Sequence, residues 1–253
     1  MEVVFLGTGT SGGVPMVGCE SPVCLSENPK DKRLRSSVLI RTQGKTLAID
    51  CSPDFRQQML RENVKRLDAI LFTHAHKDHT AGLDDVRGFN YVMKKAIPLY
   101  MNQETFDSIR KHYDYIFNGN DYPGIPQVDI KIIDNAPFMA EGIPVTPIEV
   151  MHYRLKVFAY RIEDFTYITD ANFISKQEME KIKGSRVVVI NALRKEPHVS
   201  HYNLKQAIEV IQELKPQQAY LTHISHQLGF HDEVNKELPN GIELAYDGLK
   251  FNV

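Results

Sequence analysis

The feature that most constrains the fold is a cluster of metal-ligand residues directly after an apolar, strand-like run. The run Ala69–Phe72 leads into His74, His76, Asp78 and His79. Because His74 and His76 are two positions apart, an extended backbone points both to the same side. Ligand-type side chains packed so closely at the end of a strand can serve two adjacent metal positions. A surface loop with unrelated histidines is the alternative, and the order of residue types disfavours it.

Strand-like and helix-like runs follow one another along the chain. Short apolar runs rich in β-branched residues predict strands at Val3–Leu6, Val38–Ile40, Leu47–Ile49, Ala69–Phe72, Ile97–Tyr100, Val128–Ile133, Val145–Val150, Val157–Ile162, Tyr167–Ile168, Val187–Ile190, Ala219–Leu221 and Ile242–Ala245. Apolar spacing predicts helices near Ala81 and at Pro53–Glu62, Thr105–Ile116, Lys176–Ile182 and Leu204–Leu214, the last capped by Asn203. This order favours a layered α/β protein with mixed sheets.

The segment from His74 to His79 resembles the HxHxDH signature of the metallo-β-lactamase superfamily. Further residues of the family pattern occur in the expected order, each directly after a strand-like run: Asp50, His152, Asp170 and His223. The resemblance covers essentially the whole chain. It implies a single domain over residues 1–253, an α/β fold built as a four-layer αββα sandwich with two mixed sheets.

The same resemblance implies a dinuclear metal centre that holds zinc or manganese. The first ion would be bound by His74, His76 and His152, the second by Asp78, His79 and His223, with Asp170 as a bridge. Asp50 would orient a ligand histidine through a hydrogen bond. Two such ions, about 3.5–4 Å apart, can hold a bridging hydroxide that attacks the substrate. Asp78 and His201 are the residues we expect to be catalytic.

Three features narrow the branch of the superfamily. Asp170 stands at the bridging position, where β-lactamases tend to carry cysteine, and Phe5–Pro15 resembles the opening of the ribonuclease Z-like branch. Gly18–Cys24 and Thr222–Gln227 are similar to segments of the phosphodiesterase family that opens 5-phosphoribosyl 1,2-cyclic phosphate in the bacterial carbon–phosphorus lyase pathway. The resemblance therefore implies hydrolysis of a phosphodiester, with a small cyclic phosphate as substrate.

That family also holds a third, structural zinc with three cysteines and a histidine. Cys19, Cys24 and His226 match three of these ligands, and Ser21 stands where the remaining cysteine would be. Structural zinc normally takes all its ligands from the protein, so both an intact site and a folded loop with buried thiols stay open. Cys51 we interpret as a core thiol.

His201 matches the histidine that, in this family, lies beside the two metals and protonates the leaving group. A histidine side chain suits this task because it can hold a proton near neutral pH and release it in the transition state. A loop histidine at the start of the helix Leu204–Leu214 is the structural alternative. His198 is a weaker candidate for the site, and His112 and His231 we interpret as structural or solvent-facing.

Two other functions remain open. A tRNA 3′-processing endonuclease would need a basic arm, and the interval from Asp170 to His201 holds no such insertion; Ile116–Pro126 is short and acidic-polar, and we interpret it as a lid. The balance of 30 basic and 32 acidic residues also disfavours nucleic acid as a partner. A non-hydrolytic cofactor-biosynthesis or carrier protein on the same fold, and a thiolester hydrolase, are the further alternatives.

Composition indicates a cytoplasmic protein. No apolar run reaches the roughly 18 residues of a membrane span, and no signal peptide is visible at the N-terminus. The odd number of cysteines, 3, argues against a disulfide framework and for a reducing compartment. The densest basic stretch, Lys30 to Arg35, we interpret as a solvated loop. A small-molecule substrate is the expected partner, no membrane is expected, and a homodimer is open by analogy.

Overall fold

The structure is a computed structural model that describes residues 1–119 and 122–253. Asn120 and Asp121, which belong to the predicted lid, lie outside the described residues. One sheet has the strand order β15 (Lys250–Asn252), β1 (Glu2–Gly7), β2 (Ser37–Thr42), β3 (Lys45–Ile49), β4 (Ala69–Leu71), β5 (Ile97–Met101) and β6 (Val128–Ile132). The other has the order β11 (Phe173–Ile174), β8 (Ile143–His152), β9 (Leu155–Ile162), β10 (Phe165–Ile168), β12 (Val187–Asn191), β13 (Gln218–Thr222) and β14 (Ile242–Leu244), with β7 (Phe138–Ala140) beside β8.

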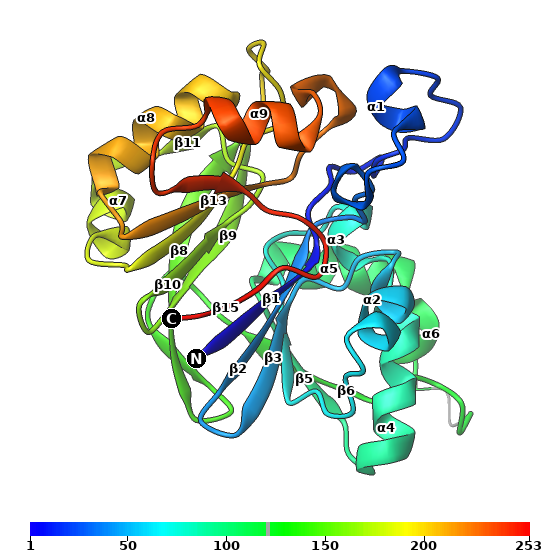
Figure 1. The fold of residues 1–253 in the computed structure, drawn as a ribbon. Helices are drawn as coiled ribbons and strands as arrows, with labels where there is room; N and C mark the ends of the chain where they lie inside the picture. The colour runs from blue at the N-terminus through cyan, green and yellow to red at the C-terminus, as the bar shows by residue number, and fades with distance from the viewer. Residues whose placement is uncertain (120–121) are drawn as a thin grey trace.

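Helices cover the outer face of each sheet (Figure 1). Those on the side of the first sheet are α2 (Phe55–Arg61), α3 (Lys77–Thr80), η2 (Leu83–Val86), α4 (Arg87–Met93), α5 (Gln103–His112) and α6 (Asp114–Phe117). Those on the side of the second are α7 (Lys176–Ile182), α8 (Leu204–Leu214), η3 (His226–Leu228) and α9 (His231–Glu237). The N-terminal loop contains α1 (Pro22–Leu25) and η1 (Pro29–Asp31). Every helix in the described ranges is too short or too polar to cross a lipid bilayer.

Apolar side chains fill the space between the layers. Phe5, Tyr160 and Phe165 belong to the core between the two sheets, and separate clusters lie under the helices of each outer layer. β4 is apolar throughout, and β12 is apolar up to its last residue, Asn191, because both faces of each strand are covered. The predicted four-layer αββα sandwich with two mixed sheets is confirmed.

Nine of the twelve predicted strands lie within observed ones, and those ending at Phe72, Ile133 and Ala245 run one residue too far. The predicted helices Lys176–Ile182 and Leu204–Leu214 match the observed bounds. The predicted helix Thr105–Ile116 is wrong in running through Tyr113, where φ is −120° and ψ is 42°. The hydroxyl of Tyr113 donates a hydrogen bond to the carbonyl of Thr80, so a tertiary contact holds the chain at this break. The strands β7, β11 and β15 were not predicted because each is only two or three residues long.

The basic stretch Lys30 to Arg35 is not a solvated loop throughout, which corrects the prediction. Arg33 is only 5% exposed, because its guanidinium donates hydrogen bonds to Thr8 Oγ1 and to the carbonyl of Ala245. It also contacts Nδ1 of His231 at 3.0 Å. The stretch therefore ties the N-terminal loop to the C-terminal part of the chain.

The topology brings several strand ends to one place. β3 and β4 pair in parallel, as do β10, β12 and β13, so their carboxyl ends lie together at one edge of each sheet. Asp50 follows β3 directly, Asp170 follows β10, and His223 follows β13. These three residues have positive φ values of 66°, 55° and 55°. The chain turns sharply at each of them, and the site is built in these turns.

Candidate metal centre

The structure gathers the predicted ligand residues into two adjoining groups. His74, His76 and His152 form one, with their ligand atoms within 4.8 Å of one another. Asp78, His79, Asp170 and His223 form the other by the same measure. Asp170 also lies within this distance of His152, so its carboxylate stands between the groups, where a bridging ligand would be.

Unpaired nitrogen atoms in the centre fit a divalent cation. Nε2 of His74 and Nε2 of His79 are buried, and neither makes a hydrogen bond within the described residues. His79 Nε2 lies 3.1 Å from Oδ2 of both Asp78 and Asp170, but outside hydrogen-bond geometry. A buried nitrogen without a partner is costly, and coordination to a cation would satisfy it. Imidazole with carboxylate suits zinc, and more oxygen ligands shift the preference towards manganese.

Asp50 orients the ligand loop from beneath. Its fully buried carboxylate accepts hydrogen bonds from the Thr73 amide at 2.8 Å, from Thr73 Oγ1 and from His79 Nδ1 at 2.7 Å. Nδ1 of His74 contacts Thr73 Oγ1 at 3.0 Å. The Nδ1 atoms of both histidines are thereby engaged, and their Nε2 atoms are left to face the metal positions. The predicted orienting role of Asp50 agrees with these contacts.

Further polar contacts orient the remaining histidines. His152 Nδ1 donates a hydrogen bond to the carbonyl of Ser200 at 2.8 Å, and Thr10 Oγ1 contacts His223 Nε2 at 3.2 Å. His223 Nδ1 lies 3.2 Å from Asp170 Oδ2. Sequence reasoning missed Thr73, Thr10 and Ser200 as orienting residues. Only Thr73, which directly precedes His74, carried a signal that could have identified it.

The electrostatics of the centre favour neutral histidines around a positive charge. Burial lowers the pKa of His223 to about 4 and holds that of His74 well below its usual range. Metals bind the neutral imidazole, so these rings are in the binding form at neutral pH. Burial also opposes charge on His79, but the carboxylates of Asp78 and Asp170 outweigh it and raise its pKa well above the usual range. The carboxylates thus favour positive charge at this point.

His201 lies at the junction of the two groups. Its Nε2 is 3.0 Å from Asp170 Oδ1, and the residue as a whole is only 9% exposed. The ring stacks on that of His223 with centroids 5.0 Å apart, and it meets the ring of His152 edge-on at 4.7 Å. The structure therefore brings His201 to the place where a substrate oxygen bound beside Asp170 would be within reach.

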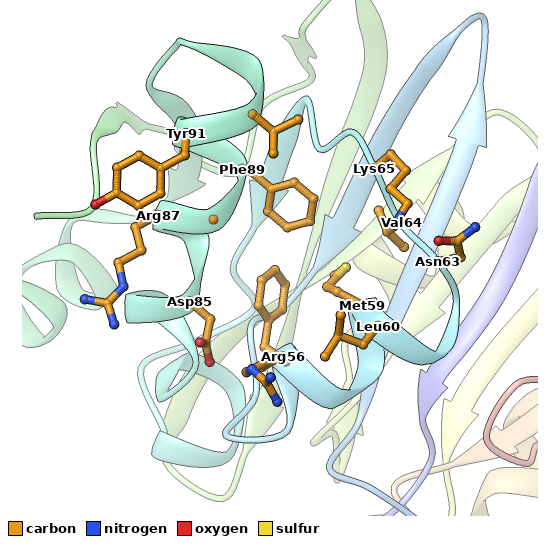
Figure 2. A pocket seen from close by; sticks show the side chains of 13 residues that line it. Arg56, Met59, Leu60, Asn63, Val64, Lys65, Asp85, Arg87, Phe89 and Tyr91 are labelled. Carbon is orange, nitrogen blue, oxygen red and sulfur yellow. The ribbon is translucent and has the colours of Figure 1, made fainter. Parts of the chain in front are cut away.

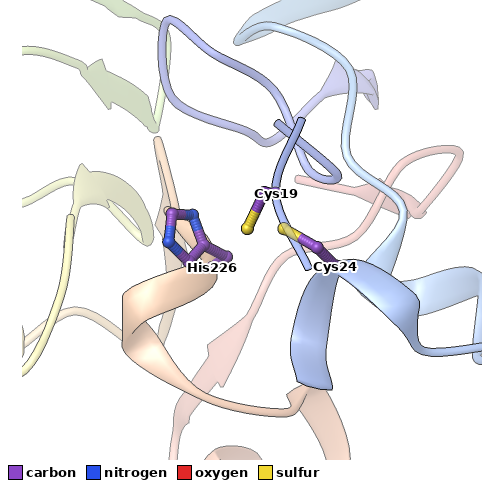
Figure 3. A group of neighbouring side chains, drawn as sticks. All are labelled: Cys19, Cys24 and His226. Atoms are coloured by element: carbon purple, nitrogen blue, oxygen red, sulfur yellow. The ribbon is translucent and has the colours of Figure 1, made fainter. Parts of the chain in front are cut away.

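A third group lies in the N-terminal loop, apart from the centre. Figure 3 shows Cys19, Cys24 and His226 facing one shared space, and their ligand atoms lie within 4.8 Å of one another. Ser21 Oγ accepts hydrogen bonds from Cys19 Sγ at 3.2 Å and from the Cys24 amide at 3.3 Å. Hydrogen bonding with Cys24 and with Ser21 lowers the pKa of the Cys19 thiol, which favours the thiolate that metals bind. Cys51 is buried outside this group.

An apolar groove on the helical face contains none of the predicted site residues. It lies between α2 and α4, has a volume of about 380 Å³ and is lined by residues that include Phe55, Met59 and Phe89 (Figure 2). The charged side chains of Arg56 and Asp85 also line it. Its lining includes no histidine or cysteine, and the groups of possible metal ligands in the described residues lie at the strand ends and in the N-terminal loop.

Comparison with known proteins identifies the family of the chain. The family model of the beta-lactamase superfamily domain matches residues 45–224. A solved structure of a new diphosphatase from the PhnP family is 39% identical, covers 100% of this chain and 97% of its own, and superposes with a TM-score of 0.93. The chain belongs to the metallo-β-lactamase superfamily, in its PhnP family. Membership in this superfamily supports a metal-dependent hydrolase.

Two further proteins similar to this chain are either lower in sequence identity or longer. The short form of human tRNase Z is 18% identical, covers 100% of this chain and 99% of its own and has a TM-score of 0.70, a likeness of fold alone. An octanoyltransferase of Porphyromonas gingivalis is 42% identical over 253 residues, which are 99% of this chain and 51% of that protein. The chain thus spans about half the length of that relative.

We expect Asp78→Ala to release the metal ion held with His79 and His223 while the ion held by the first group stays bound. Activity should fall by more than about a hundredfold, because loss of a direct ligand exceeds the 10–100-fold cost of losing an orienting contact. Elemental analysis counts the metals, and circular dichroism checks that the fold survives. Asp129→Ala, on the surface beside Lys131, is the control. An unchanged metal count in Asp78→Ala would contradict the ligand assignment.

Proposed function

We propose that this chain is a metal-dependent phosphodiesterase that hydrolyses a small cyclic phosphate such as 5-phosphoribosyl 1,2-cyclic phosphate. The observation that carries the proposal is His201 Nε2, held 3.0 Å from Asp170 Oδ1 where the two ligand groups meet. A proton donor at this point suits an ester whose leaving oxygen is a poor leaving group. The PhnP-family relative is described as a diphosphatase, which supports phosphoryl hydrolysis as the reaction class.

Different residues of the site would accept and donate the protons of the reaction. When bound, divalent cations at the two groups would neutralise phosphoryl charge and acidify water. The oxygen of water forms a new bond to phosphorus, and its released proton passes to the carboxylate of Asp78. The ester P–O bond breaks, and the leaving oxygen takes the proton from His201 Nε2. The exposed His76 and the half-buried Asp78 lie on the solvent side of the centre, where the substrate would enter.

Hydrolysis of small phosphodiesters is the direct test of the proposal. The metal-loaded protein would be assayed on a ribose 1,2-cyclic phosphate, on cyclic nucleotides, on a tRNA precursor and on an octanoyl thioester. We expect rapid opening of a cyclic phosphate and no tRNA product. Cleavage of the tRNA precursor alone would replace the proposal with an endonuclease. Cleavage of the thioester alone would point to acyl chemistry, and no cleavage at all would favour a non-hydrolytic carrier.

The role of His201 predicts a loss that depends on the leaving group. In His201→Ala, kcat for an alkyl or ribosyl phosphodiester should fall by at least about a hundredfold, the typical contribution of general acid catalysis. The loss on bis(p-nitrophenyl) phosphate should stay below about tenfold, because p-nitrophenolate leaves without a proton. His112→Ala is the matched control, since His112 is exposed and its ring donates a hydrogen bond to the Ser108 carbonyl in its own helix. Equal losses on both substrates would refute proton donation.

A zinc ion in the group of Cys19, Cys24 and His226 is the second part of the proposal. The two sulfur atoms and the imidazole supply soft ligands around one space, and the hydroxyl of Ser21 lies beside them. Zinc accepts this ligand set in tetrahedral geometry. The ion would join the N-terminal loop to η3, next to the strand end that carries His223, and so would stabilise the site without entering the chemistry.

We expect Cys24→Ser to lose this zinc while the dinuclear centre keeps its metals and activity at moderate temperature. Ser21→Cys should complete the ligand set and bind the zinc more tightly in competition with a chelator. Elemental analysis and chelator titration measure both effects. Cys51→Ala, which removes a thiol outside the group, is the control. If the unaltered protein and Cys24→Ser contain the same amount of zinc, the third site is refuted.

A further inference from the structure

In the loop that leads into α8, His198 contacts His201. Nδ1 of His201 lies 3.2 Å from Nδ1 of His198 and 3.0 Å from Ser200 Oγ. The two rings are 5.1 Å apart between centroids. His198 belongs to none of the ligand groups in the described part of the chain, and it is partly exposed. It contacts the candidate proton donor without contacting the metal ligands.

The hydrogen bonds around His198 assign the protons. The backbone amide of Ser200 donates a long hydrogen bond, 3.4 Å, to His198 Nδ1. An amide can only donate, so His198 Nδ1 presents a lone pair. Because two facing lone pairs repel each other, His201 Nδ1 must carry a proton and donate it towards His198.

The hydroxyl of Ser200 is consistent with the same assignment. Its oxygen lies 3.0 Å from His201 Nδ1 and 3.3 Å from His198 Nδ1. It can accept a hydrogen bond from the first and donate one to the second. Both routes, direct and through Ser200, leave the proton on Nδ1 of His201.

We propose that His198 is a positioning residue that holds His201 in the orientation and protonation pattern required for proton donation from Nε2. With Nδ1 engaged by His198, Nε2 is the nitrogen that exchanges its proton, and it is the atom that faces Asp170 Oδ1 at 3.0 Å. A ring free to flip would present either nitrogen to the substrate. This inference rests on the proposed function, because it assigns the positioning of the same proton donor.

His198→Ala tests the inference by its effect on two substrates. We expect kcat for an alkyl or ribosyl phosphodiester to fall about tenfold, the lower end of the effect of losing an orienting partner. KM, metal content and turnover of bis(p-nitrophenyl) phosphate should stay unchanged. His198→Asn should restore most of the loss, because its Oδ1 can accept the hydrogen bond in place of Nδ1. Val199→Ala, an exposed side chain in the same loop, is the control.

Nitrogen NMR of the imidazole rings in the zinc-loaded protein gives a readout that does not depend on turnover. We expect a protonated Nδ1 on His201 and an unprotonated Nδ1 on His198. The reverse assignment would overturn the inference, as would equal losses on both substrates or no rescue by asparagine. If His201→Ala shows the leaving-group effect and His198→Ala does not, only this inference falls. If His201→Ala shows none, the proposed proton donor falls and this inference with it.

Discussion

The hydrogen bonds of the buried Asp50 carboxylate are the interactions on which the rest of the site depends. It is fully buried at the end of β3, and it accepts hydrogen bonds from the backbone and hydroxyl of Thr73 and from the ring of His79. Burial raises its pKa, which shows that the charged form is costly here. Removing one partner from such a group leaves an unpaired buried charge, which costs about 3–5 kcal/mol. The hydrogen bonds of Asp50 therefore hold the loop of candidate ligand histidines to the first sheet, and loss of any one of them would destabilise the fold.

The second sheet meets this loop through residues in unfavourable backbone conformations. Asp170 and His223, like Asp50, have positive φ, which costs residues with a side chain of order 1 kcal/mol or more. The parallel strands around them are almost entirely buried and fix the chain on both sides of each turn. The sandwich thus supplies the stability that keeps three strained turns in place. In return, each turn aims a carboxylate or an imidazole at the same point between the sheets.

The sequence was sufficient to find the candidate ligands that the structure brings together, and insufficient to find the residues that orient them. His74 to His79 carry a spacing specific enough to predict the fold, and Asp50, Asp170 and His223 could be found because each directly follows an apolar strand. Thr10 and Ser200 could not be predicted, because they meet their histidines across 213 and 48 positions of the chain. The burial of Arg33 was missed for a similar reason, since its partners Thr8 and Ala245 come from opposite ends of the sequence. Local patterns report strands and ligand types, and they carry no information on such distant contacts.

The loop at residues 198–201 contacts both a candidate metal ligand and the proposed proton donor. The carbonyl of Ser200 holds the ring of His152, a ligand of the first group, while its amide and hydroxyl contact His198 and His201. Residues that share partners in this way do not contribute independently to function. A displacement of this loop would tilt a metal ligand and the proton donor together. The geometry of the metal centre and that of the proton donor are therefore set by the same backbone, which explains how a short loop can keep both aligned on one substrate.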